Sequence, residues 1–253
     1  MASPQENRCV GTPQWLYPGH ALNAWLESDS SRILELEILS SKRQKHAALL
    51  DQAHAKGVRV RFVEGKQRSS DTEFLQSGCR AKLAPFPYKD LASVVEPTGP
   101  GLLVVLDHVL DPRNLGAVAR NVLAAGGRGL IIPKDRAAPV TPVVEVAAAG
   151  ACAHLNICRV VNLARALEEI QAAGYWTIAL DTHAAKSLFT GSLPPRLALV
   201  AGGEQGLSRL VRERSDESRV IPIDRRVESL NVAVALGIAC FWWAKDHALT
   251  LTP

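Results

Sequence analysis

Short apolar runs alternate with longer helix-like segments along most of the chain, and this alternation constrains the fold more than any other feature. In the C-terminal part, the strand-like runs lie at residues 102–106, 129–132, 157–161, 176–180, 197–201 and 219–223. The helical segments between and after them lie at about 114–126, 141–152, 163–173, 206–215 and 230–246. Strands that are separated by helices predict a mostly parallel sheet with helices on both faces.

The N-terminal part shows the same alternation on a smaller scale. Its pattern predicts helices and strands in the order 18–28 (helix), 33–39 (strand), 43–57 (helix) and 58–64 (strand). The sequence VVEPTGPG at 94–101 contains two prolines and two glycines and is typical of a linker. We therefore expect a small α/β domain over 1–92, a linker over 93–100 and a larger α/β domain over 101–253.

Composition and charge narrow the class of protein. The chain has 253 residues and a net charge of +4, which is compatible with a nucleic-acid partner. The longest apolar run, 230–244, is interrupted by Asn231 and is too short to cross a bilayer, so we expect no membrane partner. No CxxC pair occurs, which argues against a disulfide framework or a zinc site and favours a cytoplasmic setting. The five cysteines are Cys9, Cys79, Cys152, Cys158 and Cys240.

Three loops follow predicted strands and are therefore candidate binding sites, because ligands of open α/β sheets bind beyond the carboxyl ends of the strands. They lie within LDHVLDPRNLG, LALVAGGEQGLSRLV and VIPIDRRVESLNVAVALGIACFWW. In the second loop, Gly202, Gly203 and Gly206 permit close approach of the backbone and positive φ angles. The loop matches neither a dinucleotide-binding GxGxxG nor a phosphate-binding P-loop, and Glu204 would repel a triphosphate. A purely structural strand-to-helix turn is the alternative interpretation.

The third loop leads into the most apolar helical segment of the chain. Ser229 is placed to cap the start of that helix by accepting backbone N–H bonds. Asn231 is a polar amide at the edge of an apolar helix and would need hydrogen-bond partners if it were buried.

Taken together, the three segments DPRNLGAVARNVLAAGG, LALVAGGEQGLSRLVRE and IPIDRRVESLNVAVALGIA resemble the SpoU or TrmH-type RNA 2′-O-ribose methyltransferases of the SPOUT superfamily. The resemblance covers roughly residues 100–246. The stretch 147–176 is similar to the branch that methylates a guanosine ribose in large-subunit ribosomal RNA. The first 92 residues resemble, more loosely, the small ribosomal-protein-like RNA-binding domain of that branch.

This resemblance implies a C-terminal parallel sheet with a deep trefoil knot, S-adenosylmethionine as cofactor, and a homodimer with the last helix in its interface. Phe241, Trp242 and Trp243 suit such an interface, and a role in the core is the alternative. The residues implied in cofactor binding are Gly202, Gly203, Gly206, Ile221, Ile223 and Leu230. The residues implied in catalysis are Arg120, Asn114, Glu204, Ser229 and Asn231. No metal is implied.

Two arginines, Arg113 and Arg120, lie seven residues apart and so project from nearly the same side of their predicted helix. Arg120 matches the family arginine that is implicated in activating the 2′-hydroxyl. A guanidinium is nearly always protonated, so a role as general base competes with a role in orienting the ribose or stabilising a developing oxyanion. Arg113 is either an RNA backbone contact or a solvated surface charge.

The sequence departs from the family pattern at three places, and these keep other functions open. One residue instead of two separates Glu204 from Gly206, Arg225 stands where a glycine is usual, and Ala233 lacks a hydroxyl. The alternatives are methylation of a transfer RNA or of another ribosomal site, and an RNA-binding ribosome-assembly relative that has lost turnover. In the N-terminal domain, the candidate phosphate contacts are Lys42, Arg43, Lys45, Lys56, Arg59, Arg61, Lys66 and Arg68.

Overall fold

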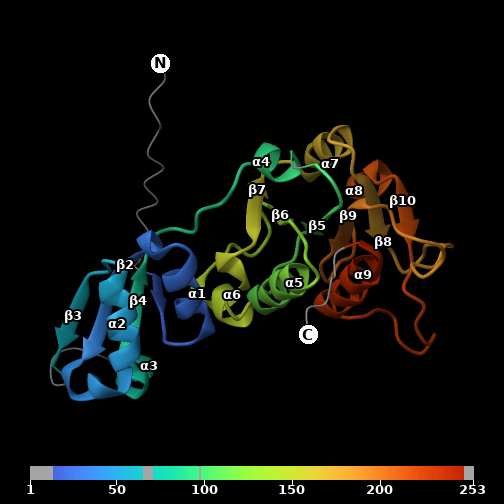
Figure 1. Cartoon of the computed structure of the whole chain (residues 1–253). Coiled ribbons are helices and arrows are strands. Elements are labelled where there is room, and N and C mark those ends of the chain that lie inside the picture. The colour runs from blue at the N-terminus through green and yellow to red at the C-terminus, as the bar shows by residue number, and fades with distance from the viewer. Residues whose placement is uncertain (1–13, 65–70, 97, 248–253) are drawn as a thin grey trace. The chain divides into compact units, whose positions relative to one another are not determined.

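The computed structural model describes residues 14–64, 71–96 and 98–247. The chain divides into two compact units, Met1–Pro87 and Tyr88–Pro253 (Figure 1). Cys9, Lys66 and Arg68 lie outside the described residues.

The N-terminal unit is a four-stranded sheet in the order β1-β4-β2-β3, in which β2 and β3 are parallel and the other pairs antiparallel. Its strands are β1 Gln14–Leu16, β2 Ile33–Leu39, β3 Val60–Val63 and β4 Cys79–Leu83. Its helices are α1 His20–Ser28, α2 Ala47–Ala55 and α3 Thr72–Ser77. The predicted elements are therefore present, but the helix expected over 43–57 begins only at Ala47.

The late start of α2 follows from side chains that bind the end of α3. Lys42 Nζ donates hydrogen bonds to the carbonyl oxygens of Leu75 (2.9 Å) and Gln76 (2.7 Å). His46 Nε2 lies 2.9 Å from the carbonyl oxygen of Ser77. These contacts satisfy carbonyls that a helix end leaves unpaired. The chain around them forms two short 3₁₀ turns, Ser40–Lys42 and Gln44–His46, in place of the first turn of the predicted helix.

A network of charged side chains lies on one face of this sheet. Arg80 Nε donates to Glu37 (2.8 Å) and its Nη1 donates to Asp71 (2.8 Å), while the guanidinium stacks over Trp15 at 3.9 Å. Tyr17 donates its hydroxyl proton to the same oxygen of Asp71 at 2.7 Å. Burial, together with this hydrogen bond, raises the pKa of Tyr17 to about 12. Arg80 thus joins β4 to both β2 and the start of α3.

The C-terminal unit contains a six-stranded sheet in the order β10-β8-β9-β5-β6-β7, with all neighbouring strands parallel. The prediction of an α/β fold with a C-terminal parallel sheet is confirmed. The strands are β5 Gly101–Asp107, β6 Gly129–Pro133, β7 Asn156–Val160, β8 Trp176–Leu180, β9 Arg196–Gly202 and β10 Glu217–Arg219.

The last strand ends earlier than the run 219–223 predicts. Beyond Arg219, the Val220 N–H donates to the carbonyl of Lys186 at 2.9 Å, and the Leu188 N–H donates to the carbonyl of Val220 at 2.7 Å. The chain therefore pairs with the segment around Ser187 instead of extending the ladder with β8. Pro222, which has no N–H, cannot donate to a ladder at all.

Helices cover both faces of the large sheet, as the alternation predicts (Figure 1). One layer contains α5 Pro112–Ala124, α6 Pro142–Ala147 and α9 Val232–His247, and α5 packs between the other two. The other layer contains α4 Leu91–Val95, α7 Leu163–Ala172 and α8 Arg209–Arg214. Strand residues alternate between the two layers.

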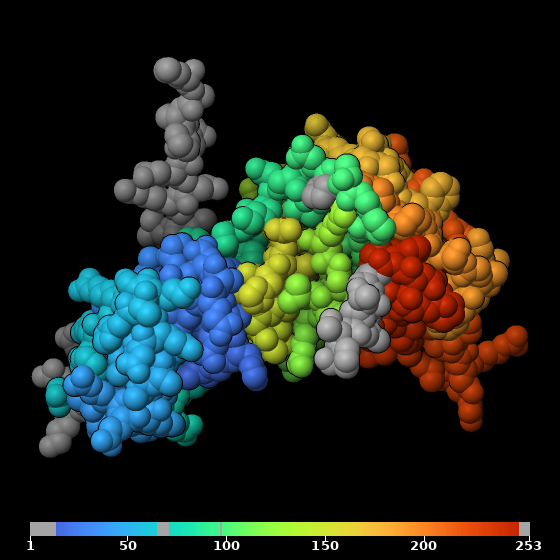
Figure 2. Space-filling model, viewed as in Figure 1, coloured from blue at the N-terminus to red at the C-terminus, as the bar shows by residue number. Residues whose placement is uncertain are grey.

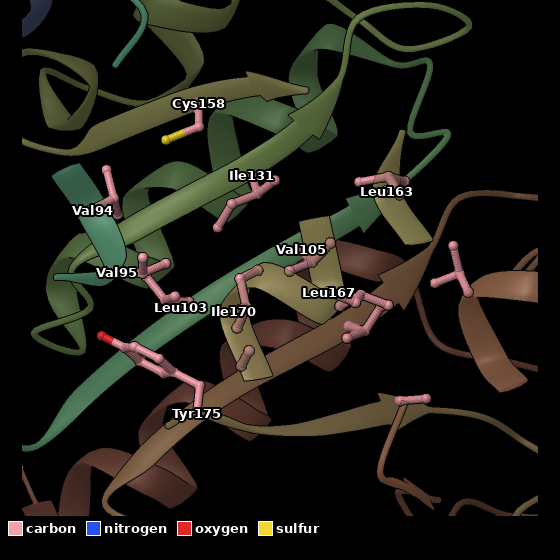
Figure 3. Packing of buried hydrophobic residues seen from close by; sticks show 14 of the residues in the cluster. Val94, Val95, Leu103, Val105, Ile131, Cys158, Leu163, Leu167, Ile170 and Tyr175 are labelled. Atoms are coloured by element: carbon pink, nitrogen blue, oxygen red, sulfur yellow. The ribbon is translucent and has the colours of Figure 1, made fainter. Parts of the chain in front are cut away.

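The core under the second layer reaches into the predicted linker. Figure 3 shows Leu103 and Val105 of β5 among apolar side chains that include Val94 and Val95. Val94 and Val95 are 2% and 8% exposed and close the short helix α4. The linker was therefore predicted to begin too early. Val94 and Val95, which the prediction placed in it, belong to α4 and cover the sheet.

The described cysteines, Cys79, Cys152, Cys158 and Cys240, are all buried and form no disulfide bond with one another. Burial raises the pKa of the Cys79 and Cys240 thiols to about 12 and that of Cys158 to about 11. These thiols stay protonated and behave as small apolar side chains. Within the described residues, no helix combines the length and apolar character that a membrane span requires.

Replacing Arg80 by Ala tests the charged network of the N-terminal unit. Glu37 and Asp71 would then lie partly buried without their main cation, and breaking such a buried pair typically costs roughly 3–5 kcal/mol. We expect the lower end of that range, because Arg61 still lies 3.5 Å from Glu37. Hydrogen exchange of the β2 and β4 amides measures the change in local unfolding free energy.

Arg59→Ala is the matched control, because Arg59, just before β3, pairs with Glu35 of β2 at 3.3 Å but is 79% exposed. An exposed pair contributes about 1 kcal/mol or less. Equal losses of protection in the two variants would contradict a special role for Arg80.

Candidate functional site

The carboxyl ends of β5 and β9 lie side by side, with Asp107 opposite Gly202 in the register. Asp107 is fully buried, and its Oδ2 accepts a hydrogen bond from the Ser208 N–H at 2.6 Å. Its carbonyl oxygen accepts a second bond, from the Gly203 N–H, at 2.9 Å. Both bonds tie the glycine-containing loop 202–208 to the end of β5. Sequence reasoning passed over Asp107, although a carboxylate that closes a fully apolar strand was the available signal.

The glycines of this loop are required by its geometry, which confirms the expectation of close approach. A Cβ atom on Gly202 would lie 2.1 Å from the carbonyl carbon of Gly206, and one on Gly203 would lie 2.5 Å from the carbonyl oxygen of His108. The turn closes through a bond from the Gly206 N–H to the Gly203 carbonyl at 2.9 Å, and Gly206 has a φ of 72°. Glu204 lies exposed at the tip of the turn.

His108 is a second residue that the sequence did not single out. It has a left-handed backbone, with φ of 57°, which is uncommon for a residue other than glycine. Its Nδ1 lies 2.5 Å from Oδ1 of Asp107, an oxygen whose geometry gives it no hydrogen bond. The imidazole is about one-third exposed, at 34%.

Asparagines join the first and third predicted segments. Asn231 Nδ2 donates to Asn114 Oδ1 at 3.0 Å, which links the start of α9 to the start of α5. Asn231 Oδ1 accepts from the Ala233 N–H at 2.9 Å and so caps α9. About two turns further along α5, Asn121 Nδ2 donates to the Ala233 carbonyl at 2.8 Å. The structure therefore brings Asn114 and Asn231 together, and Asn121 is a third member of this seam that the sequence analysis missed.

The prediction that Ser229 caps the last helix is wrong. The helix begins at Val232, so its capping position falls on Asn231, and Ser229 lies exposed before it. Ile221, Ile223 and Leu230 are half-buried. Between them, residues 224–229 are exposed, and Figure 2 shows the orange-red segment between β10 and α9 standing out from the C-terminal unit.

Arg225 carries no backbone strain. Among the described residues other than glycine, positive φ angles occur at His108, Arg136 and Ala149. A side chain at position 225 is therefore compatible with the backbone, even where a glycine is usual.

The two arginines of α5 have different surroundings. Arg113 donates to Asp111 through Nε (3.2 Å) and Nη2 (3.1 Å), and this hydrogen bonding holds the pKa of the Asp111 carboxyl below its usual value. Arg120 is exposed, and among the residues that the structure describes it has neither an ion-pair nor a hydrogen-bond partner. Arg113 is thus engaged within its own helix cap, whereas Arg120 is available to a ligand.

This arrangement offers backbone N–H and C=O groups and half-buried apolar side chains, with no cation in the glycine-containing loop. Such a surface suits a heterocyclic ligand better than a polyphosphate, which needs positive charge or a P-loop. In the described part of the chain, no three His, Cys, Asp or Glu side chains are grouped as a metal site would require.

Known proteins with similar sequences are RNA methyltransferases. Residues 101–241 match the model of the SpoU rRNA Methylase family. The 23S rRNA (guanosine-2′-O-)-methyltransferase RlmB of Xylella fastidiosa strain 9a5c is 38% identical over 245 residues, which are 93% of this chain and 98% of that protein. The protein of the same name from Vibrio cholerae is 35% identical, over 89% of this chain and 94% of its own length.

Solved structures share the fold. The SpoU methyltransferase AviRb of Streptomyces viridochromogenes, in complex with its cofactor AdoMet, aligns with a TM-score of 0.77 and 21% identity. The alignment covers 92% of this chain and 89% of that one. An AdoMet-bound rRNA methyltransferase from Sinorhizobium meliloti aligns with a TM-score of 0.72 and 24% identity, over 94% and 89% of the two chains.

Two substitutions at Asn231 distinguish the effect of its capping bond to Ala233 from that of its bond to Asn114. Asn231→Ala removes the capping oxygen, which typically costs about 1 kcal/mol, so the amides of Ala233 and Val234 should exchange faster with solvent. Asn231→Asp keeps a capping oxygen and loses only the donor to Asn114, so these amides should stay protected. Hydrogen exchange of the first turn of α9 measures both. Equal deprotection in the two variants would show that the tie to Asn114, and not the cap, holds the start of the helix.

Proposed function

The chain belongs to the SpoU rRNA Methylase family, and from this premise we propose that it transfers a methyl group from S-adenosylmethionine to a ribose 2′-hydroxyl of ribosomal RNA. The similarity to guanosine-2′-O-methyltransferases of 23S rRNA, at 38% and 35% identity along nearly the whole length of both chains, carries the proposal and favours a guanosine of the large subunit.

The glycine-containing loop suits S-adenosylmethionine. Its glycines bring the backbone so close to the end of β5 that adenine and ribose would meet N–H and C=O groups instead of side chains. We assign the cofactor to Gly202, Gly203 and Gly206, together with the half-buried Ile221, Ile223 and Leu230. No cation lines this loop, which fits a ligand whose reactive sulfonium is itself positive. When bound, the cofactor supplies an electrophilic methyl group.

The protein must also orient the ribose and help the 2′-hydroxyl to lose its proton. Arg120 is exposed and has no partner among the described residues, so its guanidinium is available to the substrate. Because guanidinium groups are poor general bases, we propose that Arg120 orients the ribose or its phosphate and stabilises the oxygen as negative charge develops. Asn114 and Asn231 hold the starts of α5 and α9 together, and Glu204 lies at the tip of the glycine turn.

Three features favour an active enzyme over a relative that has lost turnover. The shortened loop still closes its turn through the Gly206–Gly203 hydrogen bond at 2.9 Å. Arg225 adopts an ordinary negative φ, so it does not strain the third segment. Ala233 uses only its backbone groups, which bind Asn231 and Asn121 and need no hydroxyl.

We propose that the N-terminal unit binds RNA, but through fewer of the predicted cations. Lys42 is bound to carbonyl groups at the end of α3, and Arg59 and Arg61 pair with Glu35 and Glu37 at 3.3 and 3.5 Å. Arg43 stacks over the exposed ring of Phe62 at 5.1 Å, which leaves a cation and an aromatic face at the edge strand β3.

We propose a homodimer that forms through the outer face of the α5, α6 and α9 layer. Four apolar side chains stand exposed there: Val143 (55%), Val146 (60%), Val234 (51%) and Phe241 (45%). Of the aromatic run in α9, Trp243 is buried and donates to the Pro194 carbonyl, so it belongs to the core, whereas Phe241 faces outward. Burying this face would also bring Arg120 to the interface.

The proposed activity is tested with purified protein, S-adenosylmethionine and unmodified 23S rRNA transcript. We expect calorimetry to show one cofactor per chain, and mapping of labelled methyl groups to find a single 2′-O-methylated guanosine. Methylation of a transfer RNA transcript instead would favour the alternative substrate. No cofactor binding by the folded protein would favour a relative without turnover.

Arg120→Ala should lower methyl transfer by roughly 100-fold or more, the usual loss when one donor to a developing oxyanion is removed, while the affinity for S-adenosylmethionine stays unchanged. Arg113→Ala is the control, because Arg113 is already bound to Asp111. Methyl transfer by Arg120→Ala at the wild-type rate would refute the assignment.

The variant Val234→Glu/Phe241→Glu should convert a dimer into a monomer, because it places two charges on the proposed apolar interface. Light scattering after gel filtration measures the mass. Leu210→Glu, at a residue that is 48% exposed on α8 in the other layer, should leave the mass unchanged. A dimer that survives the double substitution would place the interface elsewhere.

A further inference from the structure

The loop after β6, residues 134–140, carries three charged side chains, Lys134, Asp135 and Arg136, and is held firmly by hydrogen bonds. The Lys134 N–H donates to the Val160 carbonyl at 2.8 Å, and the Ala138 N–H donates to the Val109 carbonyl at 2.9 Å. The Val140 N–H donates to the hydroxyl of Tyr88 at 2.8 Å. The loop is therefore fixed to β7, to the segment after β5 and to the start of this unit.

Three basic side chains gather on this loop and on the neighbouring strand β7. Lys134 and Arg136 are exposed, and Arg136 has a left-handed backbone with φ of 53°. Arg159 of β7 donates through Nη2 to the Lys134 carbonyl at 2.8 Å, and its guanidinium lies 5.1 Å from the ring centre of Tyr88. A strained residue in a well-anchored loop is typical of functional sites, where the backbone fixes the direction of a side chain.

The positive charges of these three residues are not neutralised by carboxylates, whereas those of most other basic residues in the unit are. Most other basic side chains there lie within 4.0 Å of a carboxylate. These are Arg113, Arg165, Lys186, Arg209, Arg212, Arg214, Arg219, Arg226 and Lys245. Lys134, Arg136 and Arg159 have no ion-pair partner among the described residues. Asp135 lies between the first two in sequence, so the three cations together leave an excess of positive charge.

This group of basic side chains lies at the same edge of the sheet as the candidate site. β6 is the neighbour of β5 in the sheet, and β7 is the neighbour of β6. All are parallel, so the loop after β6 lies at the same edge as Asp107 and the glycine-containing loop. With about 4.8 Å between adjacent strands, the group begins roughly 5–10 Å to the side of the end of β5.

We propose that Lys134, Arg136 and Arg159 form a phosphate-binding site for the RNA strand that flanks the target nucleotide. This inference rests on the proposed function, which brings RNA to this edge of the sheet. Phosphate contacts fix the position of a nucleic acid without reading its sequence, so the site would hold the strand in register while the glycine-containing loop holds the cofactor.

The test compares Lys134→Ala/Arg136→Ala with Arg165→Ala/Arg209→Ala. Both double variants remove two positive charges from exposed positions of the same unit, but Arg165 and Arg209 each pair with a glutamate one turn away. The dissociation constant for unmodified 23S rRNA transcript is measured over a series of salt concentrations. Calorimetry with S-adenosylmethionine and thermal unfolding check that each variant is folded.

We expect the Lys134/Arg136 variant to bind the transcript several-fold more weakly, with a salt dependence whose log–log slope is smaller by about 1 for each lost contact. The control variant should keep the wild-type slope, and cofactor affinity should be unchanged in both. Equal slopes for the two variants would overturn the inference, even if the enzyme methylates rRNA. A reduced slope in the Lys134/Arg136 variant would support the site even if the wild-type protein methylated no RNA.

Discussion

The pairing of β5 with β9 is the contact on which the candidate site depends. These strands are distant in sequence, yet their register places Asp107 directly opposite Gly202. The buried carboxylate then binds the Ser208 N–H, and the Asp107 carbonyl binds the Gly203 N–H. Because buried polar groups are costly unless they are hydrogen-bonded, these bonds fix one conformation of the loop. Glycines at 202 and 203 are the residues that allow the backbone to come so close.

A second constraint couples this edge to the outer helices. Asn114 and Asn121 of α5 face the start of α9. Asn231 donates a hydrogen bond to Asn114, and Asn121 donates one to the carbonyl of Ala233. The same asparagine that joins the helices also caps α9, so the beginning of the last helix and the beginning of α5 are positioned together. Arg113 and Arg120 project from another part of α5. The helix thus uses its amides for internal packing and keeps one arginine for contacts outside the chain.

The alternation of strands and helices was predictable because the period of apolar residues depends on local structure alone. The close approach at Gly202 and the positive φ of Gly206 belong to one local turn and were predictable as well, whereas Gly203 is required by the carbonyl of His108, which is distant in sequence. The role of Ser229 was not, since Asn231 caps the helix instead, and its side chain is held by Asn114, which is distant in sequence. Nor was the ending of β10 at Arg219, where the chain changes partner from β8 to the segment around Ser187. Val94 and Val95 were assigned to a linker because only the folded sheet shows what they cover.

Net charge is a weak guide to RNA binding in this chain, and the ion pairs explain why. The sequence has 29 basic and 25 acidic side chains, which leaves +4 spread over the molecule. Many basic residues are neutralised by neighbours or bound to helix ends, including several that the sequence suggested as phosphate contacts. Only the basic residues that have no such partner can attract a phosphate. In the described part of the C-terminal unit they include Arg120, Lys134, Arg136 and Arg159. A mildly basic protein can therefore present a localised positive surface, since ion pairs neutralise many of the other basic side chains of that unit.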